Sequence, residues 1–315
     1  MKLSLVVPCY NEEGNVSLFY DEVIKTFEKC KYKLEIIFVN DGSKDYTRTE
    51  LENIVKMAKV DVKVIDFSRN FGKEAAMYAG LRNTTGDFIS VIDADLQQDP
   101  KYVLEMLEFL DGNVDYDCVA MCQKERKEGV ILSFLKKTFY KIINSISQVT
   151  FVSGASDFRL FRRKMVDSIL EVSEYYRFSK GIFSWVGYNT YYMTYEVRER
   201  ANGTTNWSFW KLFKYAIDGI VAFTTTPLRI ATITGIISAL GSVFYLLFVI
   251  IQKLSFGIEM PGYATIVVLI LLLGGLQLFA LGIIGEYLAR TYMEVKKRPI
   301  YIARDIISNK KDKVK

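Results

Sequence analysis

The chain has 315 residues, of which 50% are hydrophobic, and its formal net charge is +5. It contains no histidine, which excludes histidine-based catalysis and histidine metal ligands but leaves carboxylate chemistry open. The mean hydropathy of +0.13 is high for a chain that is 24% charged, which indicates a polar domain joined to a very apolar segment.

The N-terminal part of the chain alternates apolar runs with segments of helical periodicity. The apolar runs predict strands at residues 3–7, 34–39, 62–67, 88–92 and 116–122. Helical spacing of apolar residues between the first four runs predicts a helix in each interval. This β-α-β-α-β-α-β order predicts an α/β domain with a parallel sheet that is covered on both faces.

Polar segments follow each of the first four predicted strands. They read PCYNEE, NDGS, SRNFGK and DADLQQ. Because parallel sheets bind ligands at the carboxyl ends of their strands, these loops together predict a site for a small charged ligand. The sequence contains neither a G-x-G-x-x-G pattern nor a P-loop, so neither a dinucleotide fold nor a P-loop protein is supported.

Asp93 and Asp95 follow the fourth predicted strand with one residue between them. In an extended chain the side chains of residues i and i+2 point to the same side, so both carboxylates could face one ligand. Hard cations prefer oxygen ligands and often bridge to phosphates, which favours Mg²⁺ or Mn²⁺ here. The alternative is that both carboxylates are solvated turn residues.

Residues 230–251 and 260–285 contain no charged side chain. A bilayer core about 30 Å thick is spanned by about 20 helical residues, so each stretch is long enough to cross it. We therefore expect a transmembrane hairpin with helices at about 228–252 and 262–287. The alternative is a pair of buried core helices.

Charge predicts how this hairpin is oriented. Residues 286–315 contain nine Lys or Arg and four Asp or Glu, whereas Lys253 is the single basic residue between the apolar stretches. Basic flanks stay on the cytoplasmic side, so we expect a multi-pass protein of the cell membrane with its N-terminal domain and both termini in the cytoplasm. The basic tail suits anionic lipid headgroups, and no nucleic-acid partner is expected.

Two further segments predict amphipathic helices at the membrane surface. Residues 130–150 place apolar side chains on one helical stripe with lysines beside it, and residues 207–222 combine tryptophans with lysines. Both patterns are typical of helices that lie in the lipid headgroup region. An ordinary surface helix packed on its own domain is the alternative for the first segment.

Several of these motifs in combination resemble one protein family. VVPCYNEE, VNDGSKD, SRNFGKEAA, DADLQQDP, DFRLFRRK and ERANGTTNWSFWKLFKYAIDGI resemble the polyisoprenyl-phosphate glycosyltransferases of glycosyltransferase family 2, which include bactoprenol glucosyltransferases and dolichol-phosphate mannose synthases. The resemblance covers nearly the whole chain. It implies a cytoplasmic GT-A-type nucleotide-sugar-binding domain at 1–226 that includes the interface helices, two transmembrane helices within 227–289 and a cytoplasmic basic tail at 290–315.

The resemblance also implies roles for individual residues. The nucleotide-sugar would contact Pro8, Tyr10, Glu12, Asp41, Lys73 and Asp93, with Asp41 on the uracil. Mg²⁺ or Mn²⁺ would be held by Asp93, Asp95 and Gln97. For Lys73 the alternative is a surface lysine at the start of a helix.

On the acceptor side, the resemblance makes Asp157 a catalytic carboxylate together with Asp93. The acceptor phosphate would be bound by Arg126, Arg159, Arg200 and Thr205. The alternative for Asp157 and Arg159 is a structural ion pair. Asn206 stands where the family often has a lysine, so one basic contact is missing in this chain.

The implied activity is inverting transfer of a sugar from a nucleotide-sugar to undecaprenyl phosphate or another polyprenyl phosphate, for modification of the cell envelope or of glycans. UDP-glucose is the first choice of donor, and UDP-GlcNAc, UDP-GalNAc and GDP-mannose are alternatives. A separate flippase would move the product across the bilayer. A homo-oligomer such as a tetramer is expected.

Two other functions are the alternatives to sugar transfer onto a polyprenyl phosphate. A processive membrane polysaccharide synthase would carry a Gln-x-x-Arg-Trp motif and more spans, and the sequence has no such motif. A non-catalytic scaffold would not need the polar residues of the site, and their presence argues against it: Asp93, Asp95, Gln97 and Asp157.

Overall fold

The computed structural model describes residues 1–124, 138, 140, 141, 143–147, 149–196, 198, 219, 221–256 and 262–310. The chain divides into two compact units. Unit 1 comprises Met1–Gly219 and Pro299–Lys315, and unit 2 comprises Ile220–Arg298. Most of the predicted interface segments 130–150 and 207–222 lie outside the described residues.

Unit 1 is built on a mixed eight-stranded sheet with the strand order β7-β5-β6-β4-β1-β2-β3-β8. The strands are β1 (Lys2–Cys9), β2 (Lys33–Asn40), β3 (Asp61–Phe67), β4 (Phe88–Val91), β5 (Cys118–Gln123), β6 (Ala155–Arg162), β7 (Thr190–Tyr195) and β8 (Ala303–Ser308). β1 to β4 pair in parallel. β6 is antiparallel to β4 and β5, and β8 is antiparallel to β3.

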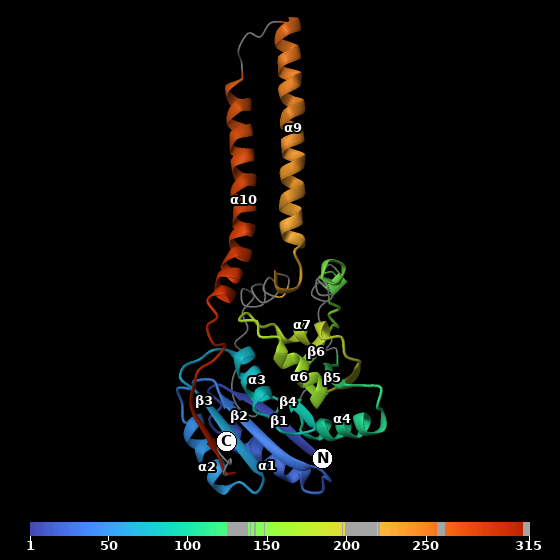
Figure 1. Ribbon diagram of the computed structural model, residues 1–315, viewed down its shortest axis with the longest axis vertical. Coiled ribbons are helices and arrows are strands. Elements are labelled where there is room, and N and C mark those ends of the chain that lie inside the picture. The colour runs from blue at the N-terminus through green and yellow to red at the C-terminus, as the bar shows by residue number, and fades with distance from the viewer. Residues whose placement is uncertain are drawn as a thin grey trace. The chain divides into compact units, whose positions relative to one another are not determined.

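The helices of unit 1 connect these strands and cover the sheet (Figure 1). They are α1 (Asn15–Phe27), α2 (Thr47–Met57), α3 (Lys73–Arg82), α4 (Lys101–Gly112), α6 (Arg163–Glu171) and α7 (Ser179–Trp185). The first three lie between consecutive parallel strands, as the apolar periodicity of the sequence predicted.

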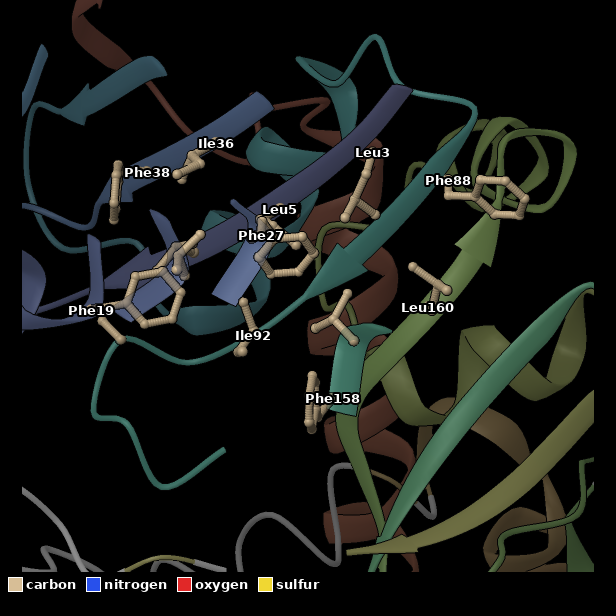
Figure 2. Close-up of a cluster of buried hydrophobic side chains, with 14 of the residues drawn as sticks. Leu3, Leu5, Phe19, Phe27, Ile36, Phe38, Phe88, Ile92, Phe158 and Leu160 are labelled. Atoms are coloured by element: carbon tan, nitrogen blue, oxygen red, sulfur yellow. The ribbon is translucent and has the colours of Figure 1, made fainter. Parts of the chain in front are cut away.

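Strand β2 is buried on both faces because helices cover both sides of the sheet. Ile36 and Phe38 point into a large core that also contains side chains of α1 and α4, and Figure 2 shows part of this cluster. Ile37 and Val39 point into a second cluster under α3. Burial of each such side chain contributes roughly 1.5–3 kcal/mol. At Gly80 of α3 a Cβ would lie 2.2 Å from a side-chain carbon of β1, so this helix approaches the sheet closely.

The expectation of a parallel sheet is right for β1 to β4 and wrong for the sheet as a whole. β6 and β8 lie outside the regular strand-helix repeat that forms β1 to β4, and both run antiparallel to their neighbours. β8 belongs to the segment that the sequence presented only as a basic tail. Arg48 fastens this strand to the sheet, with ion pairs of 3.0 Å to Asp66 and 2.9 Å to Asp305.

Unit 2 contains the helices α9 (Thr226–Phe256) and α10 (Tyr263–Val295), which lie next to each other (Figure 1). Both helices are long and apolar enough to cross a membrane, and 18-residue windows within Thr226–Gln252 and Thr265–Val295 have mean hydropathies of 2.3 and 2.7. None of either stretch is buried within the protein, which argues against core helices. The predicted pair of apolar C-terminal helices is confirmed.

Candidate active site

The loops after β1 and β2 are fastened to each other at the carboxyl edge of the parallel strands. The backbone N–H of Glu12 donates to Thr47 Oγ1 at 2.8 Å, and the Glu12 carboxylate accepts from Asn15 Nδ2 at 2.7 Å. Pro8 is half-buried at the end of β1, and Tyr10 is exposed just beyond it. Three of the predicted donor-side residues therefore lie on one short, braced segment.

Asp41 connects the loop after β2 to the loop after β3. Its buried carboxylate accepts hydrogen bonds from the backbone N–H of Phe71 at 2.6 Å and of Gly72 at 3.0 Å. Burial raises the pKa of Asp41 above its ordinary value, although both amides favour the charged form. Gly42 is needed beside it, because φ is +65° and a Cβ would lie 2.4 Å from the carbonyl carbon of Arg69. Asp41 thus shapes the edge of the site, and its contact with uracil stays a prediction.

The loop after β4 presents the predicted metal-binding residues. Gln98 holds Asp93 at two points, because its Oε1 accepts from the Asp93 backbone N–H at 3.0 Å and its Nε2 donates to Asp93 Oδ2 at 3.1 Å. Asp95 Oδ1 accepts from the backbone N–H of Gln97 at 3.1 Å. Leu96 adopts a left-handed conformation with φ of 58°, which turns the chain between these residues. The loop is therefore held in one shape by its own side chains.

Asp93, Asp95 and Gln97 form a donor set that suits a hard divalent cation. All three offer oxygen atoms, and Mg²⁺-like cations are bound by one or two carboxylates and complete their shell with waters and substrate phosphates. Within the residues that the structure describes, no three His, Cys, Asp or Glu side chains gather into a closed metal cage. The residues present thus fit a cation shared with a bound diphosphate and do not fit a structural zinc site.

Lys73 lies between two of the predicted catalytic carboxylates. Its Nζ is 2.6 Å from Asp93 Oδ1 and 3.7 Å from Asp157 Oδ2. The Lys73 side chain is 44% exposed, so its burial is partial; this burial lowers the pKa of Lys73, but Asp93, Asp157 and Asp95 outweigh it and raise the pKa above its ordinary value. The ammonium is therefore charged and links Asp93, in the loop after β4, to Asp157 of β6, and these two contacts favour a role in the site for this partly exposed lysine.

Asp157 and Arg159 leave β6 on the same side but have different surroundings. Burial raises the pKa of Asp157, but Lys73, Lys180 and Arg159 outweigh it, so the pKa lies below its ordinary value. Asp157 Oδ1 is buried without a hydrogen-bond partner in the described part of the chain. Arg159 is 3% exposed and lies over the Phe183 ring at 4.9 Å. This burial favours a structural role for Arg159 over the predicted contact with an acceptor phosphate.

Three predicted acceptor-side residues, Arg126, Arg200 and Thr205, lie outside the described residues. Their contact with an acceptor phosphate stays a prediction. The structure therefore brings Lys73 and Asp93 of the donor side together with Asp157, and it leaves the cationic part of the acceptor site to be tested by experiment.

Glu74 is a titratable group near the site that the sequence did not reveal. Its Oε2 accepts hydrogen bonds from the Ser179 hydroxyl and from the Ser179 backbone N–H, the latter at 3.0 Å. Burial, and after it the charge of Asp157, raises the pKa of Glu74 to about 7, although Ser179 and Arg177 partly offset this. Its partners come from segments that are distant in sequence, so no local sequence pattern predicts these contacts.

We expect the stability difference between Glu74→Gln and the wild type to depend on pH. The folded protein holds the Glu74 proton up to a pKa of about 7, whereas the unfolded chain releases it near 4.5. The stability contributed by the protonated group is therefore full below 4.5 and is lost as pH rises through 7. Glutamine avoids this loss, so the variant should gain on the order of 2 kcal/mol relative to wild type across this window.

Thermal unfolding of both proteins between about pH 4 and pH 8 measures this difference. Glu171→Gln is the control, because Glu171 is an exposed residue of α6. A gain that is equal at every pH would contradict the raised pKa of Glu74.

Comparison with known proteins places the chain in a family. The model of "Glycosyl transferase family 2" matches residues 4–170. The prophage bactoprenol glucosyl transferase homolog of Escherichia coli (strain K12) is 40% identical over 307 residues, which cover 97% of this chain and 99% of the relative. The bactoprenol glucosyl transferase of Shigella phage SfX is 39% identical over 305 residues, which cover 96% of this chain and 99% of the relative.

Among solved structures, glucosyl-3-phosphoglycerate synthase from Mycobacterium tuberculosis in complex with Mn²⁺, UDP and glucosyl-3-phosphoglycerate has a TM-score of 0.46. It is 19% identical and covers 70% of this chain and 77% of its own. The family match and the site together define a sugar-transferring enzyme with a GT-A-type domain. The chain belongs to glycosyl transferase family 2, and the resemblance inferred from its motifs is confirmed. Its two apolar helices associate it with a membrane.

Proposed function

We propose that the enzyme transfers a hexose, with glucose as the first candidate, from a UDP-sugar to a polyprenyl phosphate such as undecaprenyl phosphate. The observation that carries this proposal is the position of Lys73 between Asp93 of the donor loop and Asp157 of β6. Two relatives with bactoprenol glucosyl transferase in their names match nearly the whole length of the chain, so the similarity extends through the apolar helices. Both observations support a donor site coupled to a lipid acceptor.

In this reaction an oxygen of the acceptor phosphate attacks the anomeric carbon of the sugar. The new C–O bond forms as the bond between that carbon and the UDP oxygen breaks, and UDP leaves with the electron pair. The family resemblance implies inversion at this carbon. The acceptor oxygen is already anionic near neutral pH, so Asp157 would either orient the acceptor or take a residual proton. A divalent cation held by Asp93, Asp95 and Gln97 would supply positive charge for the leaving diphosphate.

A panel of nucleotide-sugars with undecaprenyl phosphate and the purified full-length protein tests the proposal. We expect UDP-glucose to be used at least about tenfold faster than UDP-GlcNAc, UDP-GalNAc or GDP-mannose, because hydrogen-bonding sites discriminate strongly between polar groups. Mass analysis should show the lipid phosphate with one added hexose. A different best donor would correct the choice of sugar, and no transfer from any donor would reject the proposed function.

The two units of the chain support a cytoplasmic location for the catalytic domain. The chain leaves unit 1 at Gly219 and returns to it at Pro299, so both ends of the α9–α10 hairpin are joined to the same unit. An even number of spans satisfies this connection. Lys296, Lys297 and Arg298 follow α10 directly, and basic flanks stay on the cytoplasmic side.

Cysteine labelling tests this orientation. Ser255→Cys, placed at the exposed end of α9 in a background without Cys30 and Cys122, should react with a membrane-impermeant maleimide added to intact cells. Asp115→Cys is the control, because Asp115 is exposed on the catalytic unit and should react only after lysis. The reverse pattern of labelling would place the catalytic unit outside the cytoplasm.

A further inference from the structure

The segment that follows α10 returns to the sheet of unit 1 and runs beside β3 (Figure 1). The Tyr301 ring of this segment stacks on the ring of Phe67, the last residue of β3, with centroids 5.0 Å apart and planes 18° apart. The same ring meets the Tyr78 ring of α3 edge-on, with centroids 6.4 Å apart. Tyr301 therefore contacts both elements that flank residues 68–72, which form the β3–α3 loop.

The backbone at the start of this loop is held by the same segment. The Ser68 N–H donates to the carbonyl oxygen of Ile302 at 3.0 Å, and the Arg304 guanidinium donates to the Ser68 carbonyl oxygen at 3.1 Å. The register of β3 and β8 shifts between Asp66 and Phe67, which makes Arg304 the extra residue of a bulge. Bulges commonly re-aim a side chain next to an active site, and this one turns Arg304 onto the loop.

The other end of the loop leads to residues of the site. Phe71 meets Phe67 edge-on at 5.7 Å, and its backbone N–H donates to the Asp41 carboxylate at 2.6 Å. Phe71 and Tyr301 both pack against the buried cluster under α3. Lys73 follows the loop directly as the first residue of α3. Aromatic rings in contact therefore connect the segment after α10 to the part of the chain that places Asp41 and Lys73.

We propose that Tyr301 and Arg304 are positioning residues for the active site and that they act through the β3–α3 loop on Lys73. Tyr301 holds both ends of the loop and Arg304 holds its first residue. The loop in turn places Lys73 between Asp93 and Asp157. The effect on sugar transfer rests on the proposed function, because it takes Lys73 as a residue of that reaction. The segment that follows the apolar hairpin thus contributes to the geometry of the catalytic site.

Hydrogen–deuterium exchange of the full-length protein without substrate tests the contact. Backbone N–H groups of the loop donate hydrogen bonds in the wild type, so a peptide covering residues 67–73 reports on it. This peptide should exchange at least about fivefold faster in Tyr301→Ala and in Arg304→Ala, the factor expected when a contact of ordinary strength is lost. Tyr301→Phe, which keeps the ring, should match the wild type.

Two features of β8 make this comparison decisive. Ile306→Ala is the matched control, because Ile306 is 55% exposed on the same strand and pairs with Ile65 before the loop begins. Arg304→Ala leaves the buried Asp66 with its closer ion pair to Arg48 at 3.0 Å, so it tests the loop even if Tyr301→Ala loosens the whole unit. The contact is overturned if neither alanine variant speeds exchange in the loop while a peptide covering β1 keeps the wild-type rate.

Initial rates of sugar transfer test what the contact does. Tyr301→Ala should lower transfer at least about tenfold, because a displacement of about 1 Å within an active site can cost about 10²-fold. In the Lys73→Met background the same substitution should change the rate less than about twofold, because the residue that it positions is gone. Tyr301→Phe and Ile306→Ala should keep wild-type rates. A tenfold loss in both backgrounds would assign Tyr301 to general stability and overturn the positioning role.

The two proposals fail in different ways. Absence of transfer by the wild type with every donor would reject the proposed function, whereas the exchange measurements would still decide the contact. Normal transfer by the wild type, combined with unchanged rates in Tyr301→Ala and Arg304→Ala, would reject the positioning role alone.

Discussion

Replacement of Asp95 by alanine is expected to reduce sugar transfer at least about 10³-fold, which corresponds to several kcal/mol of lost stabilisation of the leaving diphosphate. Asp95 belongs to the braced loop after β4, and its Oδ1 already accepts the Gln97 backbone N–H. We expect the Mn²⁺-dependent affinity for UDP to fall as well. Initial rates of transfer and calorimetry with UDP, each over a series of Mn²⁺ concentrations, measure the two effects.

Asp115→Ala is the matched control, because Asp115 is an exposed aspartate in the turn before β5. It should keep wild-type rates and wild-type dependence on Mn²⁺. Full activity of purified Asp95→Ala would remove this residue from the metal-binding set. Loss of transfer with an unchanged affinity for UDP and Mn²⁺ would instead assign Asp95 to the chemical step.

The parts of the fold that could be predicted from sequence have strong local patterns. β1 to β4 are apolar runs separated by helical periodicity, and α9 and α10 are long uncharged stretches. β8 carries no comparable signal, because Ala303–Ser308 includes charged residues and becomes a strand only by pairing with β3. Its position depends on a partner more than 200 residues away, with Arg48 and Asp305 paired across 257 positions.

The same distinction applies to the site. Asp93 and Asp95 could be predicted, because their spacing after a strand reflects local geometry. Gln98 and Glu74 could not, since Gln98 acts through the Asp93 carboxylate and Glu74 acts through Ser179, which is 105 positions away. A polar residue that acts by orienting another residue does not occur at a characteristic spacing in the sequence, so a motif search does not find it.

Lys73 illustrates how tertiary contacts decide between readings that the sequence left open. Lys73→Met is expected to lower transfer by about 10² at neutral pH, the lower range for loss of one electrostatic contact in an active site. The variant removes the ammonium from between Asp93 and Asp157. The pKa of Asp157 should then rise, because burial is opposed only by Lys180 and Arg159 once the Lys73 charge is gone.

The pH dependence of the rate separates charge from shape at this position. In the wild type Asp157 is ionised throughout the neutral range, because its pKa is lowered. In Lys73→Met the fall of the rate on the acid side should begin at a higher pH than in the wild type, whereas Lys73→Arg should restore the wild-type profile. Lys29→Met, at an exposed position, controls for the substitution itself. If the arginine and methionine variants lose activity equally and share one pH profile, the shape of the lysine side chain matters more than its charge. That result would contradict a catalytic role for the charge of Lys73 between the two carboxylates.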